Sequence, residues 1–277
     1  MSMKLILCEK PSMGKTIAAA LGSITRYDGY LEVPGYVVTW CFGHMYELDD
    51  MEQYLHPDFK KGDKAEWRLH DLPFYPEEWQ FRYSPKQDSG VKKQLRIIER
   101  LLNRKDIDTI SAAGDADREG EVIGRMPIER LLKSHKQILR LWLPALTPDA
   151  IREGVRNARP DVMYDGLYHA GRIRAAVDWM IGIELTRYVT IKERRLFSMG
   201  RCICPIVSKI VEREQMIRSF TPTRYIALIS KESYGGITLE LKSEKTFALD
   251  DMGTAARTII NGIGAFIAYI APPFNGL

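Results

Sequence analysis

The sequence lacks any run of about 18 consecutive apolar residues, the length that a helix needs to span a bilayer. Its first residues, Met1 to Cys8, contain too few apolar positions for a signal-peptide core and no small-residue cleavage site. Hydrophobic residues make up 45% of the chain and charged residues 27%, which is typical of globular proteins in water. These absences predict a cytoplasmic protein with no membrane partner.

Cysteine is also scarce, with four residues in 277, at positions 8, 41, 202 and 204. So few cysteines in a chain of this length do not form the disulfide framework of a small secreted protein. Cys202 and Cys204 form a C-x-C pair, but a structural zinc site would need a second pair or a nearby histidine, and neither is present. We therefore expect reduced thiols.

A strong net charge is missing as well, because the formal charge is only +4. The charge is unevenly spread, however, since the segment from Arg187 to Arg218 contains eight Lys or Arg and three Glu. A concentrated basic stretch favours a polyanionic partner, because contacts with phosphates release counterions and supply most non-specific affinity. The alternative is a solvated helix face that binds nothing.

Short apolar runs alternate with helical periods over residues 1–150. Strands are predicted at 4–8, 107–112 and 138–143, and two hairpins with turns at Asp28-Gly29 and Pro34-Gly35. Helices are predicted at 14–21, at Val91 to Leu102, from about Glu119, and from Thr147 with Pro148 at its first position. This alternation predicts an α/β domain with a mainly parallel sheet, interrupted by an irregular excursion at residues 44–90.

The pattern changes after residue 150. Residues 151–218 have an almost entirely helical period, with Tyr168 to Arg187 as the longest stretch. Apolar runs at Tyr225 to Ser230 and Gly236 to Leu241 are typical of strands, and they surround a run at Ala255 to Ile260. We predict three parts: an α/β domain at 1–150, a helical segment at 151–220, and the start of a β-containing domain at 221–277.

The most informative segment is GDADREGE at 114–121, which directly follows a predicted strand. In open α/β sheets, ligands bind at the carboxyl ends of the strands. Clustered carboxylates repel one another unless a cation lies between them, and ligands that are all oxygen favour Mg²⁺. Glu9 also follows a strand and would lie beside Asp115 if the two strands are neighbours. Lys10 and Arg118 would border this magnesium site; the alternative is a solvated acidic loop.

Nucleotide binding is not expected, although Gly14-Lys15-Thr16 is how a phosphate-binding P-loop ends. That loop needs a glycine five residues before its second one, and Glu9 occupies the position. A carboxylate at this position would repel a phosphate.

Together, ILCEKPSMGKT at 6–16 and GDADREGE resemble the Toprim domain, which has a Rossmann-like α/β fold. Further motifs resemble topoisomerase III, a type IA DNA topoisomerase, in order and spacing over essentially the whole chain. They are VVTWCFGH from Val37, WRLHDLP from Trp67, the stretch from Arg174 to Arg187, SMGR at 198–201, Pro205, and IVERE from Ile210.

The resemblance implies a magnesium site formed by Glu9, Asp115, Asp117 and Glu119. It implies that Glu9, Lys10 and Glu119 are catalytic, with Lys10 assisting proton transfer or neutralising the scissile phosphate. It also implies a groove for single-stranded DNA, lined or shaped by Trp67, Arg174, Asp178, Trp179, Arg187, Arg194, Ser198, Gly200 and Arg201.

Several of these residues have a plainer interpretation. Trp179 lies on an apolar helical face and would equally suit a packed core. Arg174 and Asp178 are one helical turn apart and could pair only with each other. His44, in the VVTWCFGH motif, could be either a buried, hydrogen-bonded histidine or a contact with DNA.

The chain departs from the family pattern in three places. None of its thirteen tyrosines is followed two residues later by arginine, as the nucleophilic tyrosine of the family typically is. Cys202-Ile203-Cys204 stands where the family usually has Val-Gln-Ser or Val-Gln-Thr, and Pro127 would kink or delay a helix. We therefore expect a chain that ends before the catalytic tyrosine and that only binds Mg²⁺ and single-stranded DNA on its own.

Two other functions stay open at this point. A stand-alone Toprim nuclease would activate water at the same metal and would nick DNA without a covalent protein–DNA adduct. A non-catalytic DNA-binding half would instead need a separately encoded C-terminal portion. We expect a monomer in the absence of such a partner.

Overall fold

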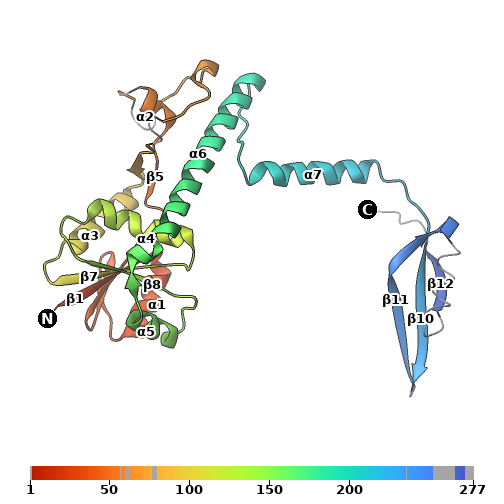
Figure 1. Ribbon diagram of the computed structural model, residues 1–277, viewed down its shortest axis with the longest axis horizontal. Helices are drawn as coiled ribbons and strands as arrows, with labels where there is room; N and C mark the ends of the chain where they lie inside the picture. The colour runs from red at the N-terminus through yellow and green to blue at the C-terminus, as the bar shows by residue number, and fades with distance from the viewer. Residues whose placement is uncertain are drawn as a thin grey trace. The chain divides into compact units, whose positions relative to one another are not determined.

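A computed structural model describes residues 2–56, 58–59, 63–76, 80–234, 236–251 and 266–271 (Figure 1). The chain forms two compact units, Met1–Cys204 and Pro205–Leu277. Within the described ranges, no helix combines the length and the apolar character needed to cross a membrane. The three-part division at residues 150 and 220 stays a prediction.

A seven-stranded sheet forms the centre of the first unit, in the order β2-β3-β4-β1-β7-β8-β9. Its four central strands run parallel: β4 (Tyr36–Trp40), β1 (Met3–Cys8), β7 (Ile107–Gly114) and β8 (Gln137–Trp142). The edge strands run antiparallel to their neighbours: β2 (Thr25–Tyr27), β3 (Tyr30–Val33) and β9 (Arg159–Pro160). The predicted α/β fold with a mainly parallel sheet is confirmed.

Helices cover both faces of this sheet (Figure 1). Side chains alternate along β1, so that Leu5 and Leu7 face one core and Ile6 and Cys8 face the other. The first core is closed by α3 (Ser89–Leu102) and α4 (Arg118–Leu131), and the second by α1 (Pro11–Leu21) and α5 (Pro148–Arg156). Burial on both faces explains why the β1 sequence is a continuous apolar run rather than an alternating one.

Helix α4 corrects one part of the prediction for Pro127: the helix is not delayed, since it begins at Arg118 and continues past the proline to Leu131. A kink at Pro127 stays a prediction. Proline has no N–H, so the carbonyl of Ile123, four residues earlier, loses its partner within the helix. The Cys41 thiol lies 3.8 Å from this carbonyl and donates to it. Burial raises the pKa of Cys41 to about 12, which keeps the proton on sulfur. All four cysteines are free, as predicted.

Helix α1 also differs from prediction, since it begins at Pro11 and not at Gly14. Proline suits the first turn of a helix, where an N–H would have no partner inside the helix.

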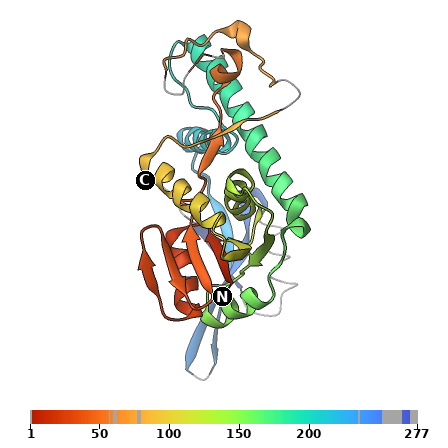
Figure 2. The same cartoon turned by 90° about the vertical axis from the view of Figure 1, so that its left-hand side faces the viewer.

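The excursion at 44–90 is partly regular. It contains β5 (Tyr46–Leu48) paired with β6 (Tyr83–Pro85), the short helix α2 (Met51–Leu55) and the 3₁₀ turn η1 (Leu69–Asp71). It lies along the C-terminal half of the long helix α6 (Asp165–Glu193) (Figure 2). This helix follows the 3₁₀ turn η3 (Asp161–Tyr164). The Phe74 N–H donates to Glu184 Oε1 at 2.6 Å, which fixes the excursion to α6.

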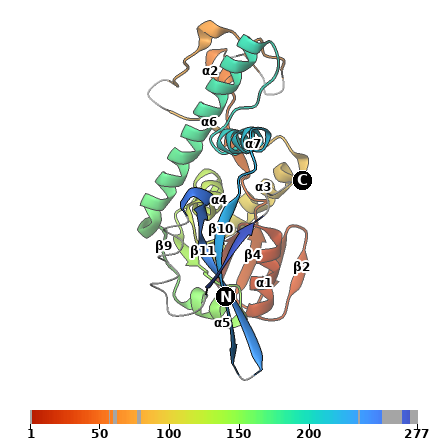
Figure 3. The ribbon, with the colours of Figure 1, turned by 90° about the vertical axis from the view of Figure 1, so that its right-hand side faces the viewer.

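The predicted helical stretch is broken in the structure. Helix α6 ends at Glu193, the following Arg194 has a left-handed φ of 52°, and a non-helical segment precedes α7 (Ile203–Arg218). The second unit contains most of α7 and an antiparallel sheet in the order β11-β10-β12 (Figure 3). Its strands are β10 (Tyr225–Tyr234), β11 (Ile237–Ala248) and β12 (Phe266–Ala271), with the 3₁₀ turn η4 (Leu249–Asp251) after β11. The predicted strands near 225 and 236 are thus present, while Ala255 to Ile260 lies outside the described residues.

Candidate metal and nucleic-acid site

The carboxyl ends of β1 and β7 bring Glu9 and Asp115 together. The two strands are parallel neighbours with Cys8 opposite Ala113, so the residues that follow leave the sheet at the same edge. The Glu9 N–H donates to the Ala113 carbonyl at 2.8 Å. The Asp115 N–H in turn donates to Glu9 Oε2 at 2.8 Å. The predicted adjacency of the two strand-end acids is therefore present.

Lys10 lies between these two carboxylates. Its ammonium is 3.1 Å from Asp115 Oδ2 and 3.7 Å from Glu9 Oε1. The hydrogen bond with Asp115 raises the pKa of Lys10, with a smaller contribution from the charge of Glu9, so the side chain stays protonated. One positive charge is thus shared by two acidic side chains.

The other two acids of the predicted cluster have partners of their own. Asp117 Oδ1 accepts from the Gly120 N–H at 2.8 Å and so caps the N-terminus of α4. Glu119 lies in the first turn of α4, where its Oε1 is 2.8 Å from Arg174 and its Oε2 is 3.4 Å from His44 Nε2. His44 is therefore not a buried histidine, since 41% of its side chain is exposed.

As they stand, no three acidic, histidine or cysteine side chains among the described residues are grouped closely enough to bind a metal ion. The donor set still suits Mg²⁺, which takes one or two carboxylates and keeps several waters. The position of the Lys10 ammonium demonstrates that Glu9 and Asp115 can share a cation. Glu9 and Asp115 would hold Mg²⁺, whereas Asp117 and Glu119, the other two predicted ligands, contact the Gly120 N–H and Arg174.

Two glycines allow the acidic turn to pack tightly. A Cβ on Gly120 would lie 2.4 Å from the Asp115 carbonyl oxygen, and one on Gly114 would lie 2.7 Å from the Gly120 carbonyl oxygen. Both distances are too short for any side chain. The glycines that flank the motif in sequence therefore bring the strand end and the helix start into direct contact.

Arg140 on β8 is buried beneath the acidic turn and stabilises it through hydrogen bonds. The sequence alone did not indicate this role. Its guanidinium donates to the Asp115 carbonyl at 2.8 Å, to the Gly114 carbonyl at 3.3 Å, and to Glu121 Oε2 at 2.6 Å. Both charged side chains of this pair are fully buried. Burial raises the pKa of Glu121, although Arg140 acts in the opposite direction. The available signal was an arginine inside the otherwise apolar run at 138–143.

A second arginine, Arg174 on α6, reaches the turn from its exposed side. It contacts Asp178 at 3.6 Å as well as Glu119, so the predicted pair within the helix exists but is not exclusive. Asp178 also accepts two bonds from Arg201, from Nε at 2.5 Å and from the terminal nitrogen at 2.9 Å. This bidentate contact lowers the pKa of Asp178.

The structure brings two of the other predicted DNA residues together. Arg187 is buried, pairs with Glu52 at 2.8 Å, and lies 5.2 Å above the centre of the Trp67 ring. These contacts fix α2 to α6. Arg194 and Ser198 are instead exposed on the segment after α6, and Gly200 donates its N–H to Cys204 Sγ at 3.2 Å.

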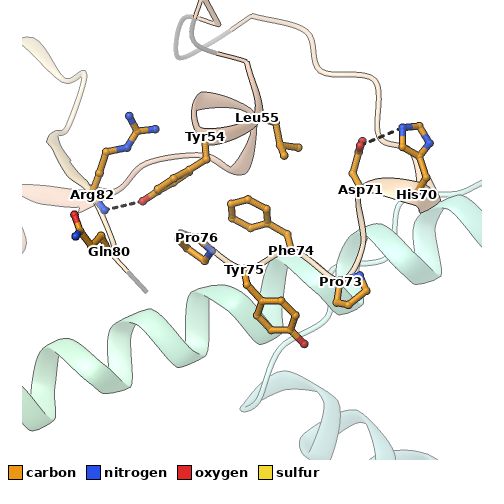
Figure 4. A pocket seen from close by; sticks show the side chains of 10 residues that line it. All are labelled: Tyr54, Leu55, His70, Asp71, Pro73, Phe74, Tyr75, Pro76, Gln80 and Arg82. Atoms are coloured by element: carbon orange, nitrogen blue, oxygen red, sulfur yellow. Dashed lines mark hydrogen bonds and ion pairs between the residues drawn. The ribbon is translucent and has the colours of Figure 1, made fainter. Parts of the chain in front are cut away.

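Trp179 packs in an aromatic cluster with Tyr54, Phe74 and Phe81, at ring distances of 6.2, 6.3 and 6.0 Å. Such contacts are those of a packed core, one of the two interpretations of this residue. Tyr54 and Phe74 also line a pocket of about 690 Å³ in the excursion (Figure 4). There the Arg82 guanidinium stacks 4.2 Å from the centre of the Tyr54 ring. None of the ten residues that line this pocket belongs to the acidic turn.

The sheet order and the acids at the ends of β1 and β7 define a Toprim domain, and the Toprim family model matches residues 4–145. A second family model, described as DNA topoisomerase, matches residues 162–265. The chain belongs to the type IA DNA topoisomerases and is topoisomerase III-like.

Relatives with the name DNA topoisomerase 3 agree with this assignment. The protein of Bacillus subtilis (strain 168) is 37% identical over 246 residues, which cover 89% of this chain and 32% of the relative. The protein of Shouchella clausii is 35% identical over 256 residues, covering 91% and 33%. That of Staphylococcus epidermidis is 35% identical over 243 residues, covering 88% and 32%. The chain thus spans about a third of the length of these relatives.

Proposed function

We propose that this chain forms the Mg²⁺- and single-stranded-DNA-binding part of a topoisomerase III-like enzyme. The complete enzyme would cleave one DNA strand, pass another through the break, and reseal it. The observation that carries the proposal is the convergence of Glu9, Asp115 and Lys10 at one edge of the sheet. Oxygen ligands and a lysine at one point suit a phosphate that gains negative charge during reaction.

Each group would have a separate task. Bound Mg²⁺ would offset negative charge on the phosphate. Lys10 would hold its proton beside that phosphate, or pass it on to a leaving oxygen. Arg174 and Arg201 are exposed enough to clamp neighbouring phosphates of the strand, for which the guanidinium fork is well suited.

Since no tyrosine of the chain has the Tyr-x-Arg pattern, we expect the 277 residues alone to bind DNA without relaxing supercoils. The test would measure Mg²⁺ binding by calorimetry, and the binding of an oligothymidine and of a duplex by fluorescence anisotropy. The Asp115→Asn variant should bind Mg²⁺ at least about tenfold more weakly, because one charged ligand is lost. Asp149→Asn is the matched control, since Asp149 is a fully exposed carboxylate on α5.

Equal Mg²⁺ affinity of the Asp115→Asn variant and the native chain would refute the proposed metal site. Robust Mg²⁺-dependent relaxation would refute the missing-nucleophile argument. Nicking without a covalent adduct, abolished by Asp115→Asn, would favour the stand-alone nuclease.

A second candidate function is a DNA-binding half that works with a tyrosine-bearing polypeptide. The observation that favours it is the row of exposed apolar side chains on α7, at Ile206, Ile210 and Ile217. Co-purification with such a polypeptide tests this candidate. The monomeric state and the cytoplasmic location stay predictions, and light scattering tests the first.

A further inference from the structure

A continuous series of side-chain contacts runs from the acidic turn to the segment after α6. His44 contacts Glu119, Glu119 contacts Arg174, Arg174 contacts Asp178, and Asp178 contacts Arg201. The last three contacts are ion pairs, and we call the four residues that form them, Glu119, Arg174, Asp178 and Arg201, the ion-pair series. All of them belong to the first compact unit. Glu119 is therefore the point at which the proposed metal site meets the proposed DNA contacts.

Every member of the series is open to solvent. The exposed fraction of the side chain is 38% for Glu119 and 35% for Arg174. Ion pairs this exposed contribute little to stability, so their partners can be exchanged at small cost. A guanidinium binds carboxylate and phosphate with the same fork of N–H donors. Arg174 donates to Glu119 from one terminal nitrogen at 2.8 Å, so a DNA phosphate would compete with the Glu119 carboxylate for this donor.

We infer that Arg174 couples the two ligands by exchanging the Glu119 carboxylate for a DNA phosphate. This inference rests on the proposed function. Without DNA, Arg174 holds Glu119 and competes with Mg²⁺ for its charge. When a phosphate takes Arg174, Glu119 becomes free to face the metal beside Asp115. Because coupling between two binding sites is reciprocal, Mg²⁺ must strengthen DNA binding by the same factor.

Asp178 and Arg201 complete the arrangement. Asp178 is engaged by both nitrogens of the Arg201 fork and lies 3.6 Å from Arg174. It therefore keeps Arg174 oriented while the Glu119 partner changes. Arg174 is a positioning residue in this account, since it acts on the metal through Glu119.

The test measures Mg²⁺ affinity of the full 277-residue chain by calorimetry, alone and saturated with a ten-nucleotide oligothymidine, with the DNA-only titration subtracted. We expect oligothymidine to raise the Mg²⁺ affinity about five- to tenfold. In Arg174→Gln, Mg²⁺ affinity without DNA should rise above that of the native chain, and DNA should no longer change it. In Glu119→Gln, DNA should still bind but the coupling should disappear.

Three controls separate this inference from simpler effects. Arg118→Gln removes an exposed positive charge from the same turn; it should raise Mg²⁺ affinity by electrostatics yet keep the coupling. Arg172→Gln removes another arginine of α6, one that stacks on Tyr83 and Tyr168, and should leave the coupling intact. Arg174→Lys keeps the positive charge but removes the planar guanidinium, so it tests whether the coupling depends on the paired N–H donors of arginine. Circular dichroism verifies that each variant is folded.

The outcomes are distinct. If Mg²⁺ and oligothymidine both bind the native chain with independent affinities, the coupling is refuted while the proposed function stands. An Arg174→Gln variant with unchanged Mg²⁺ affinity and intact coupling also overturns it. If neither ligand binds the native chain, the proposed function itself fails.

Discussion

Glu119 and Glu121 are two residues apart at the start of α4 and each binds an arginine, yet the two pairs differ sharply in burial. Glu121 and Arg140 are buried, with 1% and 0% of their side chains exposed. Glu119 and Arg174 are 38% and 35% exposed. Their nitrogen–oxygen distances, 2.6 and 2.8 Å, are nearly the same. Burial, and not distance, therefore separates a supporting pair from an exchangeable one.

The difference follows from solvation. Two charges taken out of water must be paired, because a single buried charge left behind is strongly destabilising. Two charges at the surface keep most of their hydration whether or not they touch. Arg140 can therefore fix the backbone of the acidic turn, while Arg174 is suited to change partners.

The largest effect should come from the buried pair. Arg140→Met leaves Glu121 as a buried charge without its partner, and it removes the donors to the Gly114 and Asp115 carbonyls. We expect a loss of about 3–5 kcal/mol in the free energy of unfolding, measured with urea. The double variant Arg140→Met/Glu121→Leu should recover part of it. A loss below about 1 kcal/mol would mean that the buried pair contributes no more to stability than an exposed pair does.

A smaller effect should come from the turn that Arg140 supports. Gly120→Ala places a Cβ within 2.4 Å of the Asp115 carbonyl oxygen, so the turn must move. We expect a loss of about 1–3 kcal/mol in unfolding free energy and weaker Mg²⁺ binding. The matched control is Gly166→Ala, in the first turn of α6, where a Cβ meets nothing within 4 Å. This control should leave Mg²⁺ binding unchanged; equal behaviour of both variants would contradict the argument.

The smallest effect should come from the exposed end of the ion-pair series. Arg201 holds the pKa of Asp178 below its ordinary value, so the pair stabilises the fold above the unfolded pKa. That contribution is lost as the pH falls through the lower pKa of the folded state. In Arg201→Gln the Asp178 pKa, followed by NMR, should rise towards about 3.9, and the unfolding midpoint at neutral pH should fall only slightly because the pair is exposed. An Asp178 pKa that does not move would refute the pairing.

The sequence predicted the backbone frame of the site better than its side-chain contacts. Apolar runs that end in Glu9 and Gly114 identified two strands and the edge where they meet, because strand ends are local features. The partner of Glu119 is 55 residues away on α6, and no local pattern indicates it. Arg140 was missed for a related reason: an arginine in an apolar run is interpreted as exposed until its buried partner is known.

Helix boundaries gave a different lesson. Pro127 was expected to kink or delay α4, because proline frees the carbonyl of Ile123 and its ring crowds that carbonyl. The helix begins at Arg118 and continues past Pro127, so it is not delayed. Cys41, 82 residues away, donates to the freed carbonyl, and no local pattern indicates this tertiary contact.

The reversal at Arg194 sets a length constraint. The segment after α6 runs back along the helix, and the Thr186 hydroxyl binds both the N–H and the carbonyl of Met199, at 2.9 and 3.3 Å. Arg201, two residues further on, therefore meets the turn of α6 that carries Asp178. The number of residues between Arg194 and Arg201 therefore determines which turn of α6 the Arg201 guanidinium contacts. One inserted residue would displace it from Asp178.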